Sequence, residues 1–281
     1  MTLTWMVAAA VLLGALLHAS WNAVIKASPD QELDTAVMHG TGALIALPAA
    51  LAVGGPPAEA WPYILASVAI HVGYFITLAG ALRHGDLGLA YPLMRGTAPL
   101  LVALAASLAL GETLSSWAWA GVLGVCAGVT AMGLSREALA QPKAVGFALA
   151  NAAIIALYTV VDALGVRASG NPLQYVLALF ALSGWPFALL VLARRGRSVA
   201  WPYARARWPF AMGGALASKG SYGLALWAMT QAPVATVAAL RETSVLFAVL
   251  LGTWFLKEAF NLRRAVGTAV IVAGVLALRM G

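Results

Sequence analysis

Hydrophobic residues fill long stretches of this chain, and short segments rich in charge, proline and glycine separate them. An α-helix needs about 20 apolar residues to cross about 30 Å of hydrocarbon, and several of these stretches reach that length. Cutting the chain at the polar segments therefore predicts ten membrane-spanning helices. They are expected over residues 3–25, 34–53, 62–82, 88–110, 115–134, 144–166, 172–193, 209–230, 234–256 and 262–279.

The composition supports a membrane protein. The chain has 281 residues, of which 62% are hydrophobic and only 10% are charged, whereas about 25% is usual for soluble domains. The expected fold class is an all-α integral membrane protein. The run over 3–25 is too long for a signal-peptide core and lacks a basic leader, so it is expected to be a retained span. The single Cys126 excludes an intrachain disulfide and a cysteine metal cage, and no cofactor or metal is expected.

Basic residues are distributed unevenly between the two sides of the membrane. Only Arg167 and Arg279 belong to one side, and three basic residues lie within spans. Twelve of the 17 lie in the odd-numbered connections: Lys26, Arg83, Arg136, Lys143, the five arginines of residues 194–207, Lys257, Arg263 and Arg264. Because basic connections stay cytoplasmic, both termini are expected to lie on the opposite side of the membrane, outside the cytoplasm. The net charge of +7 thus reflects topology, and no nucleic-acid partner is expected.

The longest connection, "RRGRSVAWPYARARW" from Arg194 to Trp208, has the composition of a basic interfacial loop. We therefore expect it to be a loop at the cytoplasmic surface.

An internal repeat divides the chain. "PLMRGTAPLL" places Arg95 in an apolar run, and Arg241 lies in a second such run at a spacing of 241 − 95 = 146 residues. The same spacing also aligns other polar and small residues: Thr97 with Thr243, Glu112 with Glu258, Gly121 with Gly267 and Gly128 with Gly274. Each unit holds five spans, an odd number, so the second unit must enter the membrane from the opposite side. The units expected are 1–138 and 139–281.

Sequence around the end of the fourth helix in each unit carries a family resemblance. The motifs are "LGE" (Leu110 to Glu112) followed by "AGVLGVCAGV", and "LKE" (Leu256 to Glu258) followed by "AVGTAVIVAGV". This pattern resembles the EamA type of the drug/metabolite transporter superfamily over essentially the whole chain. The resemblance implies a carrier with two inverted five-helix repeats around a central cavity.

The length and the spans rich in aromatic residues and histidine resemble the bacterial aromatic amino acid exporters within this superfamily. That resemblance implies export. Small multidrug members carry a proton-coupling glutamate in their first helix, whereas the span 3–25 has no acid, so proton coupling is not implied.

Polar side chains recur within the spans. A central Arg, Lys or Asp costs about 2.5–3.5 kcal/mol on insertion scales, so such residues are expected to face the bundle interior. Several share one helical face by spacing, although helix packing remains an alternative role. The candidate substrate-binding residues are His18, Trp21, Asn22, His71, Tyr74, Tyr158, Trp185, Lys219, Tyr222 and Trp227.

Two arginines lie at mirrored depths near prolines, which favours a gate or scaffold role over substrate contact. An acid within the spans is the expected partner for each. The candidate gate or scaffold residues are Arg95, Arg241, Glu242 and Asp162. For Asp162 the structural alternative is pairing with an arginine or lysine.

Three in-span cations against two in-span acids, with aromatic residues between, suit a substrate that has a carboxylate and an apolar body. The sequence therefore predicts a secondary transporter that exports amino acids, aromatic or otherwise apolar, or related amphipathic metabolites by alternating access. An exporter of drugs or quaternary cations is the main alternative, followed by a channel or a membrane-embedded enzyme. Enzyme motifs and a ring of pore charges are absent. The expected partners are a small-molecule substrate and the lipid bilayer, and the fused repeat favours a monomer.

The orientation can be tested with a reporter enzyme that is active only outside the cytoplasm. We expect activity when the reporter follows Gly281 and none when it follows Arg136, because an odd-numbered connection stays inside. A C-terminal reporter that works only in the cytoplasm would contradict the predicted topology.

Overall fold

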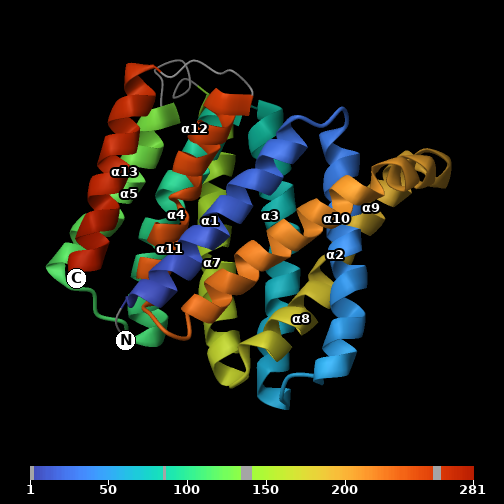
Figure 1. The fold of residues 1–281 in the computed structure, drawn as a ribbon, viewed down its shortest axis with the longest axis horizontal. Helices are drawn as coiled ribbons and strands as arrows, with labels where there is room; N and C mark the ends of the chain where they lie inside the picture. Colours follow the sequence, from blue (N-terminus) through green and yellow to red (C-terminus); the bar gives the residue numbers. More distant parts are fainter. Residues whose placement is uncertain (1–2, 85–86, 134–140, 256–260) are drawn as a thin grey trace.

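The structure, a computed structural model, describes residues 3–84, 87–133, 141–255 and 261–281, and every regular element in these ranges is a helix (Figure 1). The first half contains α1 (Trp5–Lys26), α2 (Gln31–Val53), the 3₁₀ turn η1 (Ala58–Ala60), α3 (Trp61–His84), α4 (Leu87–Leu110) and α5 (Ser116–Gly133). The second half contains α7 (Pro142–Ala168), α8 (Pro172–Ser183), α9 (Trp185–Arg195), α10 (Arg197–Ala228), α11 (Val234–Arg241), α12 (Ser244–Phe255) and α13 (Leu262–Met280).

The ten predicted spans all correspond to helices, and two of them are split. Helices α8 and α9 divide the seventh span at Gly184, and α11 and α12 divide the ninth span at Glu242 and Thr243. By length and composition, 8 of the spans in the described chain can cross a membrane. Helices α10 and α13, which carry arginines near their ends, cover the remaining two. The predicted all-α membrane fold is confirmed.

The prediction of a loop from Arg194 to Trp208 is wrong, because most of this segment is helical. Helix α9 continues to Arg195, Gly196 turns the chain with φ 77°, and α10 starts at Arg197. Arginine and alanine are good helix formers, and this turn of α10 is held by tertiary contacts. Tyr203 packs against the buried cluster that contains Leu33, and Arg207 pairs with Asp34. These contacts override the two prolines inside the helix.

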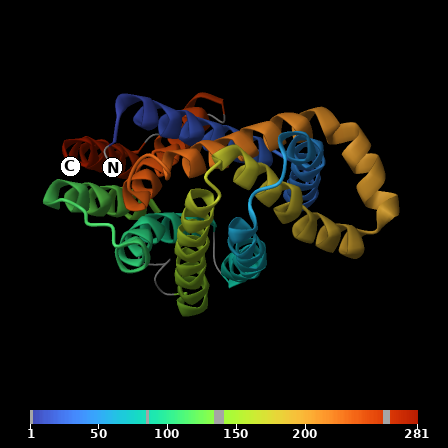
Figure 2. The same cartoon turned by 90° about the horizontal axis from the view of Figure 1, so that it is seen from below.

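The contacts between helices recur when each helix is replaced by its counterpart in the other half of the chain. Helix α3 packs on α7 as α10 packs on α1, α4 packs on α7 as α12 packs on α1, and α2 packs on α10 as α8 packs on α3. Three further pairs, α5 with α13, α2 with α8 and α4 with α11, correspond to themselves under this exchange. Figures 1 and 2 show α5 and α13 side by side at one edge of the molecule. This pattern is the one that two inverted five-helix repeats produce. The expected boundary at residues 138 and 139 lies outside the described residues.

Glycines allow α5 and α13 to pack in close contact. A Cβ on Gly121 would lie 2.8 Å from the Gly274 carbonyl oxygen, and a Cβ on Gly128 would lie 2.9 Å from that of Gly267. The reverse distances, from Gly274 to the Gly121 oxygen and from Gly267 to the Gly128 oxygen, are both 2.9 Å. Gly121 therefore meets Gly274, which is the repeat counterpart of Gly128. Gly128 in turn meets Gly267, the counterpart of Gly121, as a two-fold relation between the repeats requires. Small residues thus allow the fifth helix of each repeat to pack closely against that of the other.

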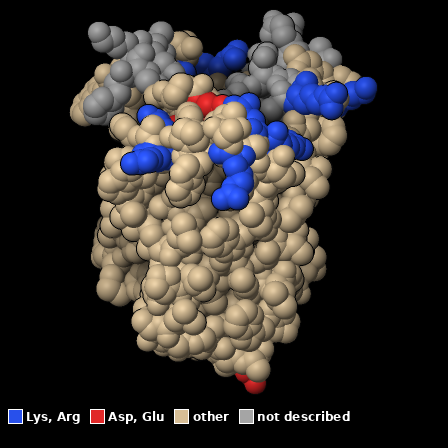
Figure 3. Space-filling view, turned by 90° about the vertical axis from the view of Figure 1, so that its right-hand side faces the viewer, with Lys and Arg blue, Asp and Glu red and all other residues tan. Residues whose placement is uncertain are grey.

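Charged residues mark the two ends of the bundle. On the face shown in Figure 3, Lys and Arg gather at the upper end, and both chain termini lie at the lower end in Figure 1. The position of both termini at one end agrees with an even number of spans. Arg136 and Lys257, which also entered the topology prediction, lie outside the described residues, as do Leu256 to Glu258. Which end faces the cytoplasm stays a prediction.

The α5–α13 contact can be tested with Gly128→Ala. A Cβ there would lie 2.7 Å from Ile271 Cγ1 and 2.9 Å from a backbone oxygen, so the helices must separate. We expect the midpoint of thermal unfolding in detergent to fall by several degrees, because close packing drives helix association in membranes. Gly146→Ala in α7 is the matched control, since no atom lies within 4 Å of its new Cβ. Equal midpoints for the two variants would contradict the contact.

Candidate functional site

A buried carboxylate joins three helices in the interior of the bundle. Asp162 of α7 has an exposed fraction of 0%. Its Oδ1 accepts a hydrogen bond of 2.8 Å from the Tyr175 hydroxyl of α8, and its Oδ2 accepts one of 2.5 Å from the Tyr222 hydroxyl of α10. The alternative of an arginine or lysine partner for Asp162 is wrong, because two phenol groups satisfy the carboxylate. Asp162 therefore fixes the position of the Tyr222 ring.

Aromatic rings surround Tyr158, which lies four residues before Asp162 on the same face of α7. The His71 ring stacks on Tyr158 with centroids 4.4 Å apart, and Tyr74 and Tyr222 each lie edge-to-face with it at 6.2 Å. Phe180 of α8 extends the group, with its centroid 6.3 Å from that of Tyr222. We call these five residues the aromatic cluster. Helices α3, α7, α8 and α10 contribute to it, so both repeats build it.

Two cations contact the rings of the aromatic cluster. The Lys219 ammonium lies 4.7 Å from the Phe180 centroid, and the Arg241 guanidinium carbon lies 5.1 Å from the Tyr222 centroid. Both cations are only partly buried. Lys219 and Tyr222 are three residues apart on α10 and share a face. The cluster thus presents ring faces with positive charge at two edges.

The other in-span arginine, Arg95, pairs with an acid of the second repeat. Arg95 Nε of α4 lies 2.9 Å from Glu242 Oε2, and Arg95 Nη2 donates a hydrogen bond of 3.4 Å to Ser244 Oγ. Arg95 and Glu242 have exposed fractions of 9% and 5%. Glu242 lies at the junction of α11 and α12, so this ion pair links the two repeats. The structure thus pairs Arg95 with one of the two acids expected as its partner.

Other side chains fix the helices around the cluster. The Asn151 amide of α7 donates hydrogen bonds of 3.0 Å to the Tyr74 carbonyl and 2.9 Å to Thr77 Oγ1 of α3. Phe75 of α3 stacks on Phe187 of α9 with centroids 4.5 Å apart, which extends the aromatic contacts to the split seventh span. Asn151 lies on the same face of α7 as Tyr158 and Asp162, because these residues are spaced seven and four apart.

Sequence patterns left Tyr175, Phe180 and Phe187 unassigned. All three lie in the apolar seventh span, where nothing distinguishes an interior ring from a lipid-facing one. Only their contacts in the fold reveal that they touch Asp162, Lys219 and the Phe75 ring.

The candidates in the first span lie on α1. His18 lies edge-to-face with Trp21 at a centroid separation of 5.3 Å. The Asn22 amide donates a hydrogen bond of 2.7 Å to the His18 carbonyl of its own helix. The Trp21 indole nitrogen is buried and has no hydrogen-bond partner among the described residues.

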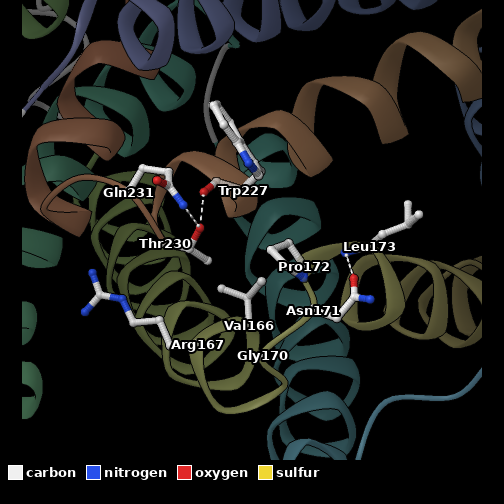
Figure 4. Close-up of a pocket in the computed structure, with 9 residues that line it drawn as sticks. All are labelled: Val166, Arg167, Gly170, Asn171, Pro172, Leu173, Trp227, Thr230 and Gln231. Carbon is white, nitrogen blue, oxygen red and sulfur yellow. Dashed lines mark hydrogen bonds between the residues drawn. The ribbon is translucent and has the colours of Figure 1, made fainter.

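Two tryptophans lie apart from the aromatic cluster. Trp185 is the first residue of α9, next to the break at Gly184. Trp227, near the end of α10, lines a cavity of about 480 Å³. Figure 4 shows that the cavity residues come from the end of α7, the start of α8 and the end of α10. They are Val166, Arg167, Gly170, Asn171, Pro172, Leu173, Trp227, Thr230 and Gln231.

Ion pairs also connect the repeats at both ends of the bundle. At the end that holds the termini, Glu112 lies 2.7 Å from Arg167 Nη2 and accepts a hydrogen bond of 2.8 Å from the Val234 amide at the start of α11. At the basic end, Arg207 binds both oxygens of Asp34 at 3.1 and 2.7 Å. The "LGE" motif contains Glu112, but only the fold shows that this glutamate, which follows α4, contacts both the end of α7 and the start of α11.

Comparison with known proteins gives a family match over nearly the whole chain. The model of the EamA-like transporter family matches residues 3–134 and again residues 142–280. A solved structure titled "Crystal structure of protein" is similar to this chain at 22% identity and a TM-score of 0.75, covering 98% of this chain and 96% of the other. At that identity the likeness concerns the fold. A search of the curated proteins found no match.

The buried Arg95–Glu242 pair can be tested with a double-mutant cycle. Arg95→Gln or Glu242→Gln alone leaves one charge without its partner inside the membrane, and we expect each to lower the free energy of unfolding by about 3–5 kcal/mol. The double variant removes both charges, so its loss should be clearly smaller than the sum of the single losses. Unfolding in detergent micelles measures all four proteins. Additive losses would show that the two side chains act independently.

Proposed function

This chain belongs to the EamA-like transporter family, and from that premise we propose that it exports amino acids or related amphipathic metabolites across the bacterial inner membrane. The observation that carries the substrate class is the aromatic cluster with Lys219 and Arg241 at its edges. Ring faces accept an apolar or aromatic body, and the cations bind a carboxylate. His71, Tyr74, Tyr158 and Tyr222 would form the walls of the site.

Alternating access requires contacts that open at one end while the other end closes. The ion pairs of Asp34 with Arg207 and of Glu112 with Arg167 each join the first repeat to the second, at opposite ends of the bundle. We propose that these pairs separate in turn as the two repeats rock against each other. The Arg95–Glu242 pair lies between them and would serve as the scaffold of the transport site.

The arrangement of the protein in the membrane is also part of this proposal. Two units, 1–138 and 139–281, form one carrier, and both termini face the periplasm because the basic end faces the cytoplasm. The carrier acts as a monomer because both repeats lie in one chain. His18, Trp21 and Asn22 on α1, with Trp185 at the start of α9, would complete the path of the substrate.

The proposal can be tested by counterflow of labelled phenylalanine into liposomes that contain the purified protein. We expect saturable uptake into vesicles preloaded with unlabelled phenylalanine, because a carrier exchanges substrate whereas a channel does not saturate. A panel of labelled sugars and quaternary cations, run with and without a pH gradient, decides between substrate classes and tests coupling.

Variants connect this transport to the aromatic cluster. Tyr74→Ala and Lys219→Ala should reduce initial exchange about tenfold or more, since a charge-assisted contact or a buried ring carries at least this much affinity. Tyr74→Phe should keep most of the rate because it keeps the ring. Leu108→Ala is the control, because Leu108 has an exposed fraction of 89% on the outer surface of α4. Unchanged exchange in both alanine variants would contradict the assigned site.

A further inference from the structure

We propose that the carrier recognises an organic carboxylate anion with an aromatic or other apolar body, and that the substrate needs no ammonium group. The inference rests on the proposed function and narrows its substrate class from amino acids to acids in general. It follows from how the described side chains distribute charge inside the spans.

Neither acid within the spans is free to bind a substrate cation. Both oxygens of Asp162 accept hydrogen bonds from tyrosine hydroxyls, and its side chain is fully buried. Glu242 is paired with Arg95 at 2.9 Å and has an exposed fraction of 5%. A substrate ammonium at the aromatic cluster would therefore meet no available carboxylate.

The two cations at the cluster are in the opposite situation. Among the described residues, no carboxylate forms an ion pair with Lys219 or with Arg241, and each cation contacts an aromatic ring instead. Arg95, the repeat counterpart of Arg241, is paired with an acid. The repeat has thus placed two arginines at equivalent positions, and of these two only Arg95 forms an ion pair among the described residues.

Unpaired cations at this depth favour an anion as ligand. A charged side chain inside a membrane is costly unless it meets an opposite charge, and the ring contacts of Lys219 and Arg241 offset only part of that cost. A carboxylate binds a guanidinium or an ammonium through charge-assisted hydrogen bonds. An ammonium on the substrate would instead be repelled by both cations, because like charges at close range in a low dielectric raise the free energy.

The rings of the aromatic cluster offer contacts to the apolar body of such a substrate. Lys219 and Tyr222 lie on one face of α10, and the Asp162 hydrogen bond holds the Tyr222 ring in position. Tyr158 presents its ring at 76° to that of Tyr222. A substrate ring can pack edge-to-face on either tyrosine while its carboxylate reaches the cations at the edge of the cluster.

Three probes that share one phenyl ring separate the possible determinants. Phenylalanine carries a carboxylate and an ammonium, 3-phenylpropanoate carries only the carboxylate, and phenethylamine carries only the ammonium. We expect the purified full-length protein in lipid nanodiscs, studied by calorimetry, to bind 3-phenylpropanoate at least as tightly as phenylalanine. Phenethylamine should bind at least about tenfold more weakly than 3-phenylpropanoate, because it lacks the group that the cations recognise.

Variants assign the charge recognition to the two cations. Arg241→Gln and Lys219→Gln should each weaken 3-phenylpropanoate binding about tenfold or more, whereas Arg241→Lys should recover part of the affinity because it restores the charge. Arg205→Gln is the matched control, since it removes the same charge at an exposed position of α10. The thermal unfolding midpoint of each variant without ligand separates loss of binding from loss of folding.

The outcomes distinguish this inference from the proposed function. If phenylalanine bound more than tenfold tighter than 3-phenylpropanoate and showed counterflow, the ammonium would be recognised, and the anion inference would fail while amino acid transport stood. If phenethylamine bound as tightly as 3-phenylpropanoate, the cations would play no part in recognition and the inference would also fail. If a quaternary cation alone bound and showed counterflow, both the anion inference and the proposed substrate class would be wrong.

Discussion

Hydrocarbon offers no hydrogen-bond partner, so each polar group within the bundle must find its partner in the protein or in a ligand. The interior of this chain follows that constraint closely. Asp162 accepts hydrogen bonds from two tyrosines, Arg95 pairs with Glu242, and the Asn151 amide nitrogen donates to Thr77 and to a backbone carbonyl. These contacts connect helices that lie far apart in sequence, so the need to satisfy buried polar groups also fixes the arrangement of the helices. Lys219 and Arg241, the two in-span cations that form no ion pair among the described residues, both contact the aromatic cluster.

The two repeats are similar in architecture and different in chemistry. The glycines of α5 and α13 meet in a reciprocal way, and helix pairs exchange across the molecule as an inverted repeat requires. Arg95 and Arg241, by contrast, have different surroundings, because Glu242 follows Arg241 in the second repeat whereas Gly96 follows Arg95 in the first. One acid serves the arginine of the opposite repeat. A symmetric scaffold therefore holds an asymmetric, positively charged site.

Ion pairs join the two repeats at both ends of the bundle. At the basic end, Arg207 donates hydrogen bonds to Asp34 from its Nε and Nη2 atoms. At the other end, Glu112 binds Arg167 and the amide at the start of α11. All of these groups join opposite repeats. Ion pairs of this kind hold a defined geometry in one state and can exchange their partners for water when the end opens. The proposed gates and the proposed binding site thus both lie where the two repeats meet.

The sequence by itself determined the membrane fold, the ten spans and the inverted repeat, because apolar length, charge distribution and a fixed spacing of glycines and arginines are properties of the chain alone. It also selected Tyr158, Asp162, Lys219 and Tyr222 as interior residues through helical spacing. Only the tertiary structure decided the partners: that Asp162 binds tyrosines, that Arg95 takes Glu242, and that the segment from Arg197 to Trp208 is helical. Partner choice depends on which helices pack together, and the pattern along one helix gives its inward face without identifying the side chain opposite.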